Sequence, residues 1–430
     1  MQPERCTWLQ WCPGRALTPR HAGSILILLW RPTAAAQRSL SVALRPSCLN
    51  AAHLEESLMS RWRGLLTSRW GPIIAGATIG ILAALLVPLG NPRNMGICVS
   101  CFMSDFAAGV GLQQMPKPHH IRPEIIGMVM GALVGALASR EFKPRTGSAP
   151  LVRFFLGLFA SIGALVFIGC PWRAYLRLAG GDWNAIAGIA GLIGGIALGT
   201  LLLRRGFDLG RSRPAPVAAG YVLPAIMVAL LGIRIAAPNW SAAQMEGAVE
   251  AVTGRIMGCA TGLGSVHAPV AISLVFGLAM GFVGQRSRFC TMAAVRDYIL
   301  MRDPHLLRGL IALVLAAFVT NLVTGYFQPG FQGQPEAHTN TFWNATSMVL
   351  TGLAVTLAGG CPGRQLFLSG EGDADAGVFV LGMLVGAAMA HNLEITSYAT
   401  GPTPRGPASV LIGLAFCVAV GLVMREPARE

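Results

Sequence analysis

A Cys-Pro-x-Arg motif occurs twice in the sequence, each time directly after a long apolar run. The first copy begins at Cys170 and reads Cys-Pro-Trp-Arg, and the second begins at Cys361 and reads Cys-Pro-Gly-Arg. Proline is favoured at the first position of a helix, so both cysteines are expected at helix N-caps. A helix N-terminus attracts anions, and Arg173 and Arg364 follow one turn later. The motif therefore predicts a small anion-binding pocket that contains a thiol.

A purely structural interpretation is also open, in which Gly-Cys-Pro ends a helix and the arginine extends its charged end to the membrane surface. Buried thiols and guanidinium groups are costly to keep at membrane depth, and they mark functional sites there. The presence of two copies favours the functional interpretation.

A second pair of similar segments begins at Cys98 and at Cys290. Asp105 and Asp297 follow these cysteines at the same spacing of seven residues. Both segments are short, amphipathic and flanked by glycine, which is typical of re-entrant half-helices. The aspartates are interpreted as ion-pair or capping groups, with proton carriage as the alternative. Cys101 lies three residues after Cys98. The two cysteines could therefore form a disulfide or have a redox role instead of lining a substrate path.

The remaining chemistry-bearing residues give weaker signals. Cysteines and histidines are not spaced as in zinc sites, so we predict neither a metal nor another cofactor. Cys417 lies in the middle of the last apolar run and is interpreted as an ordinary buried cysteine.

The composition indicates an all-α, polytopic integral membrane protein. Of 430 residues, 53% are hydrophobic and 12% are charged, and apolar runs recur along most of the chain. The net charge of +14 comes from basic residues between these runs, where they orient the protein in the bilayer, so nucleic acid is not an expected partner. Nine or ten transmembrane helices are predicted, at 72–89, 123–139, 151–169, 184–203, 217–236, 267–284, 307–327, 343–359, 377–391 and 408–424.

Clusters of arginine and lysine set the expected orientation. They precede the first predicted span and recur at 140–153 and 204–213, whereas the segment 328–340 has none. The positive-inside rule then places the N-terminus and the C-terminus inside.

The order of segments also repeats. A cysteine segment, two spans, Cys-Pro-x-Arg and a further span occur twice, with three spans between the two units. An odd number of intervening spans inverts the second unit, so we expect an inverted internal repeat with short re-entrant half-helices. The predicted organisation is a first repeat at 59–214, linking spans at 215–285, and a second repeat with the C-terminal helix at 286–430. Residues 1–58 are expected to be a disordered or mis-started extension.

Several motifs resemble the YeeE/YedE sulphur-transport membrane family, and most of all its selenium-associated YedE branch. They lie along residues 60–424 and read Asn-Met-Gly-Ile-Cys (94–98), Arg-Pro-Glu-Ile-Ile-Gly (122–127), Phe-Ile-Gly-Cys-Pro (167–171), Leu-Ala-Gly-Gly-Asp (178–182), Arg-Ser-Arg-Phe-Cys (286–290), Gly-Gly-Cys-Pro-Gly-Arg-Gln-Leu (359–366) and Ala-His-Asn (390–392). The resemblance implies import of a sulfur or selenium compound through the bacterial inner membrane. It also implies an anion path along Cys170 and Cys361, with Cys98 and Cys290 as further stations.

The sequence thus predicts a transporter rather than an enzyme, for a small anion such as a selenium compound or thiosulfate. The path residues are Cys98, Cys170, Cys290, Cys361, Arg173 and Arg364, with Cys101, Asp105 and Asp297 as secondary candidates. The bilayer, the anion and a cytoplasmic sulfur- or selenium-carrier protein are the expected partners. The alternatives are a sulfur- or selenium-transfer enzyme with a cysteine nucleophile, and a redox-active membrane protein.

Overall fold

A computed structural model of the chain describes residues 64–113, 120–236 and 266–425. The predicted extension at 1–58 falls outside the described residues. Within the described part, the secondary structure is helical apart from one two-stranded ladder, in which β1 (Arg145–Thr146) pairs antiparallel with β2 (Arg213–Pro214).

Each of the ten predicted spans corresponds to one helix of the described chain. Eight of the long helices are apolar enough to cross a membrane, and two further apolar helices, α3 and α5, are shorter. The ten helices are α3 (Gly71–Leu85), α5 (Pro123–Ala138), α6 (Pro150–Phe167), α8 (Asn184–Arg204), α9 (Val217–Ala236), α10 (Val270–Arg286), α12 (His305–Thr324), α13 (Thr341–Leu357), α15 (Ala374–Asn392) and α16 (Gly406–Val423). The all-helical, polytopic fold class is confirmed.

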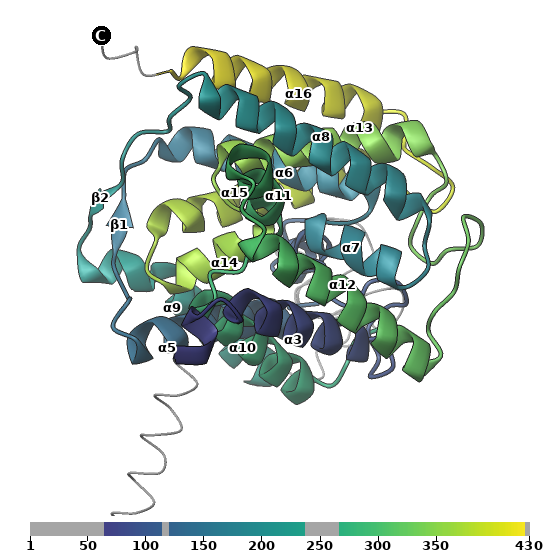
Figure 1. Ribbon diagram of the computed structural model, residues 1–430, viewed down its shortest axis with the longest axis horizontal. Coiled ribbons are helices and arrows are strands. Elements are labelled where there is room, and N and C mark those ends of the chain that lie inside the picture. The colour runs from purple at the N-terminus through teal and green to yellow at the C-terminus, as the bar shows by residue number, and fades with distance from the viewer. Residues whose placement is uncertain (1–63, 114–119, 237–265, 426–430) are drawn as a thin grey trace, which may run out of the picture. The chain divides into compact units, whose positions relative to one another are not determined.

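Four short helices begin at the four cysteines of interest. They are α4 (Val99–Gly109), α7 (Pro171–Ala179), α11 (Thr291–Met301) and α14 (Pro362–Gly370). In Figure 1, α7 and α14 lie between a lower group that includes α3, α5, α10 and α12 and an upper group that includes α6, α8, α13 and α16. The four cysteines at the starts of the short helices are all buried.

The helices follow the order that an internal repeat would produce. The series α3 to α8 has the same order of long and short helices as the series α10 to α15. Helices of each series pack against helices of the other series. Helix α3 packs on α12 and α10 on α5, while α8 packs on α13 and α15 on α6. The two halves therefore build one interlocked core.

Glycines allow these helix pairs to approach closely, as is common where lipid gives no hydrophobic drive for association. A Cβ at Gly76 in α3 would overlap the carbonyl of Gly309 in α12, and one at Gly131 in α5 would overlap the carbonyl of Leu278 in α10. Gly191 makes the same kind of contact between α8 and the Ala345 carbonyl of α13. The high glycine content of the sequence thus serves helix contacts at specific positions.

We expect Gly191→Ala to destabilise the protein by about 1–3 kcal/mol, because the added methyl group must push α8 and α13 apart. Gly194→Ala is the matched control, since this glycine lies in the same helix and has nothing within 4 Å of an added Cβ. Thermal unfolding in detergent measures both variants. Equal midpoints for the two would contradict the packing argument.

The peripheral helices carry apolar faces on the outside of the described chain. Val222 in α9, Leu315 in α12 and Ile412 in α16 are each more than half exposed. Continuous exposed apolar faces of this kind are stable only when another apolar phase covers them. The bilayer is that phase, and α9, α12 and α16 are therefore lipid-facing.

Candidate functional site

The first pair of thiols joins α4 to α7. Cys98 caps α4 with an extended backbone, and its sulfur accepts a hydrogen bond from the Cys101 N–H at 3.3 Å. The same sulfur accepts a hydrogen bond from the Cys170 N–H at 3.4 Å. Cys170 caps α7, and proline occupies the first turn of that helix, as the motif predicts. Two helix N-termini therefore meet at the sulfur of Cys98.

The second pair repeats this geometry between α11 and α14. Cys290 caps α11, and its sulfur accepts a hydrogen bond from the Ala293 N–H at 3.5 Å. It also accepts one from the Cys361 N–H, again at 3.4 Å. Cys361 caps α14, which also has proline in its first turn. All four cysteines are buried and free, so each pair is a closed site with two thiols and two positive helix ends.

Cys101 adds a third thiol to the first pair only. Its sulfur lies 2.7 Å from that of Cys98, and it accepts a hydrogen bond from Arg173 Nη1 at 3.3 Å. Ala293 occupies the equivalent position of α11, so the second pair has no such thiol. The two sites are therefore related by the repeat without being identical.

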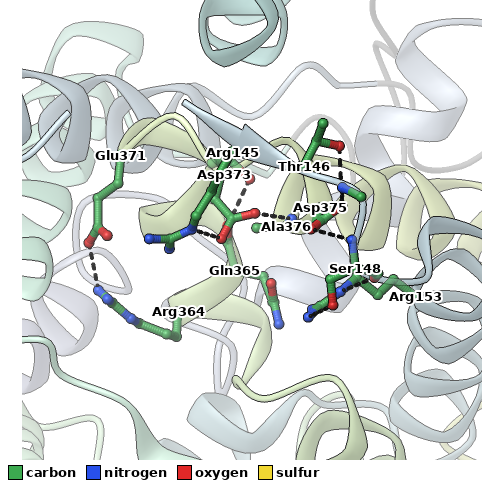
Figure 2. A network of polar contacts seen from close by, with 12 residues as sticks. Arg145, Thr146, Ser148, Arg153, Arg364, Gln365, Glu371, Asp373, Asp375 and Ala376 are labelled. Carbon is green, nitrogen blue, oxygen red and sulfur yellow. Dashed lines mark hydrogen bonds and ion pairs between the residues drawn. The ribbon is translucent and has the colours of Figure 1, made fainter. Parts of the chain in front are cut away.

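The two arginines of the motif have different partners. Arg173 is fully buried, and it donates to the carbonyls of Asn94 and Glu336 and to the Cys101 thiol, which are all uncharged groups. Among the described residues, no carboxylate lies within ion-pair distance of it. Arg364 instead pairs with Glu371 at 2.9 Å, as Figure 2 shows. The arginine of the first motif therefore has no ion-pair partner in the described chain, whereas that of the second motif has one.

The two predicted aspartates both lie in ion pairs. Asp105 in α4 accepts from Arg122, which precedes α5, and both side chains are largely buried. Asp297 in α11 pairs with its neighbour Arg296 at 2.8 Å and is more exposed. Among the described residues, no hydrogen bond joins either carboxylate to Cys98 or Cys290.

An aspartate after each Cys-Pro helix forms a backbone bridge with a loop from the other half of the chain. Asp182 follows α7 and accepts from Arg177, and its backbone forms a bridge with Gly330. Asp373 follows α14, accepts from Arg145 and forms the equivalent bridge with it. Figure 2 shows this second network, in which the neighbouring Asp375 also accepts from the loop before α6. The short helices are thus fixed at both ends.

Two cavities are lined by residues close in sequence to Cys98 and to Cys290, although none of the four cysteines lines either of them. The first cavity, about 40 Å³, is lined by Arg93 and Asn94, and the Asn94 carbonyl binds Arg173. The second cavity, about 390 Å³, is lined by Arg286, Arg288 and Asp297, of which Arg288 lies two residues before Cys290. Basic side chains line both cavities, and the second is also lined by the carboxylates of Glu141, Asp297 and Asp303.

The sequence identified the four cysteines but not how they pair, and it missed an aromatic cluster between the pairs. Trp172 lies edge-on to Phe289 and next to Phe367 from the second repeat. Its signal in the sequence is the third position of the motif, which is tryptophan in one copy and glycine in the other. The two motif copies therefore differ at this position, where only the first has an aromatic side chain.

A family model described as Sulphur transport matches residues 13–198 and 286–424. The chain belongs to this sulphur-transport family. The match includes both Cys-Pro-x-Arg motifs and all four short helices. This is the YeeE/YedE family that the motifs resemble. No curated protein matches the chain.

Membership of the sulphur-transport family agrees with the membrane fold described above. The protein is a multi-pass membrane protein, and its partners are a lipid bilayer and a small substrate. Among the described residues, no group of three or more His, Cys, Asp or Glu side chains is arranged to hold a metal ion.

Proposed function

We propose that the protein imports a small sulfur- or selenium-containing anion, such as thiosulfate, through the bacterial inner membrane. The single observation that carries this proposal is the repeated thiol pair, in which the N–H of a Cys-Pro helix binds the sulfur of the other cysteine at 3.4 Å in both halves. The uncompensated Arg173 next to the first pair adds the positive charge that an anion needs.

The chemistry of the lining suits passage rather than tight binding. A small anion loses its hydration on entering the protein, and donors along the route must replace it in part without trapping the ion. Thiols are weak S–H donors with a polarisable sulfur, so each contact with the anion is weak and easily exchanged. Helix N-termini supply a fixed positive field at both sites.

The charges in the loops support a route from outside to inside. The first cavity is lined by Gln328 and Pro335, which belong to the loop without basic residues. The second is lined by Glu141 and Arg286, next to the basic segments. The positive-inside rule assigns these cavities to opposite sides, and the Cys98–Cys170 pair then lies nearer the outside. A cytoplasmic sulfur- or selenium-carrier protein would receive the anion at the inner cavity.

Uptake by purified protein in liposomes tests the proposal. Thiosulfate, selenite and selenate are supplied outside, and both the ion inside and its chemical state are measured. Net flux of an unchanged anion supports a transporter that is not an enzyme. Conversion of the anion without flux would favour the alternative of a sulfur- or selenium-transfer enzyme, and absence of both for every anion would refute the proposal.

The proposed orientation has the N-terminus and the C-terminus inside, with an inverted second repeat. We expect a cysteine introduced at Gln332 to react with a membrane-impermeant thiol reagent on intact cells. One at Ser212 should react only after the membrane is opened. Both residues are exposed in loops of the described chain. The background carries serine at Cys259 and at the three cysteines of residues 1–58. Labelling of both positions from the same side would contradict the inversion.

A further inference from the structure

Two polar side chains of α7 are buried without a hydrogen-bond partner in the described chain. They are the Nε1–H of Trp172 and the hydroxyl of Tyr175. Trp172 is fully buried and Tyr175 is 6% exposed. Residues three apart on a helix lie on the same face, so both groups belong to one side of α7. Buried donors are almost always bonded, and two unbonded ones on one face require an explanation.

The surroundings of this face place it between the two thiol pairs. Trp172 lies two residues after Cys170, and its indole ring packs against Gly363, which lies two residues after Cys361. The ring also contacts Phe289, the residue before Cys290. One indole ring therefore separates the Cys98–Cys170 pair from the Cys290–Cys361 pair.

Tyr175 lies one turn after Trp172 in α7, and its hydroxyl is the second of the two buried donors.

The second repeat has no equivalent of this pair of donors. The position of Trp172 in the motif is Gly363 in the other copy, and that of Tyr175 is Leu366. A side chain on Gly363 would collide with the indole ring of Trp172. The centre of the repeat has room for one tryptophan only, so the first repeat alone supplies both the ring and the donors.

We propose that Trp172 and Tyr175 form a midpoint station, at which an anion that leaves the first thiol pair is bound before it reaches the second. This inference rests on the proposed function, because the acceptor for the two donors is the transported anion. An N–H and an O–H donor bind a sulfur or selenium oxyanion without adding a charge that would trap it. The indole ring, together with Phe289 and Phe367, also keeps the two pairs apart when no anion passes.

The test compares thiosulfate uptake into liposomes by Trp172→Phe and Tyr175→Phe. Each change removes one donor and keeps an aromatic ring. We expect the maximal rate to fall about tenfold or more, as for a lost hydrogen bond to a charged group. The half-saturating concentration should stay unchanged, because the first thiol pair and Arg173 still receive the anion. A purely structural role would lower the amount of folded protein without separating these two parameters.

Trp183→Phe and Tyr298→Phe are the matched controls, since both side chains are about two-fifths exposed and lie outside the thiol pairs. If the wild-type protein transports thiosulfate and the variants at 172 and 175 match these controls, the midpoint station is wrong while the proposed function stands. If the wild-type protein transports no anion, the proposed function itself fails. Thermal unfolding of each variant in detergent identifies loss of fold, and Tyr175→Phe, which removes a single oxygen atom, remains informative if Trp172→Phe is unstable.

Discussion

Cys361→Ala and Cys170→Ala are each expected to abolish most of the anion uptake while the protein is still inserted in the membrane. Each cysteine is fully buried at the first turn of a short helix, and its N–H binds the sulfur of the other cysteine in its pair. Truncating one buried thiol to a methyl group costs only about 1–2 kcal/mol of stability. Loss of a binding station in a single-file path should reduce transport far more than this change in stability.

Cys417→Ala is the control for this experiment. Cys417 is also fully buried, but it lies in the outer helix α16 and away from both pairs. It should lose a similar amount of stability and keep its uptake. Equal uptake by Cys417→Ala and Cys361→Ala would show that the thiols of the pairs contribute only to packing and do not contact the anion.

Cys361→Ser separates the two properties of the thiol. Serine keeps a hydroxyl donor of similar shape and caps helices well, so the start of α14 should be preserved. It lacks the soft, polarisable sulfur. We expect slow uptake, and uptake at the wild-type rate would mean that the path needs a hydrogen-bond donor and not sulfur.

The sequence predicts the helices of this fold well because each depends on local information. Apolar runs and their flanking charges mark the eight long apolar helices and also the two shorter ones, α3 and α5. Proline after Cys170 and Cys361 fixes both of these residues at N-caps, because the ring presets the backbone of the first turn. The order of the segments also predicts the order of long and short helices that the structure has.

Contacts between distant segments could not be predicted in the same way. Nothing local shows that the N–H of Cys170 meets the sulfur of Cys98, since that contact depends on how α4 and α7 are held by the long helices around them. The pairing of Arg364 with Glu371 was also missed, although the two are seven residues apart and lie near each other at two helical turns. The roles of the two arginines therefore differ in a way that the identical motifs do not indicate.

Because Arg173 and Arg364 have different partners, replacing Arg173 should have the larger effect on anion binding. Arg173→Met should raise the half-saturating concentration for the anion at least a hundredfold. The Arg173 guanidinium is buried among neutral acceptors and has no carboxylate within ion-pair distance in the described chain, so its charge is available to an anion at the first pair. At a separation of about 4 Å and an effective dielectric constant of about 20, two unit charges interact by about 4 kcal/mol. Arg173→Lys keeps the charge but bonds fewer of the three acceptors, so an intermediate loss is expected.

The matched control is the double variant Arg364→Met with Glu371→Gln. Arg364 and Glu371 form an ion pair at 2.9 Å, so together they carry no net charge. Methionine and glutamine at these positions also carry no net charge, so the double variant leaves the charge of the second site unchanged. Its half-saturating concentration should stay close to that of the wild type.

The single variant Arg364→Met should have a higher half-saturating concentration than the double variant. It leaves the Glu371 carboxylate unpaired at the second site, where it repels the anion. Concentration-dependent uptake into liposomes measures the half-saturating concentration of the four variants and of the wild type. A wild-type half-saturating concentration in Arg173→Met would place the first anion contact elsewhere, whereas a loss in the double variant equal to that of Arg173→Met would mean that the two arginines are equivalent despite their different partners.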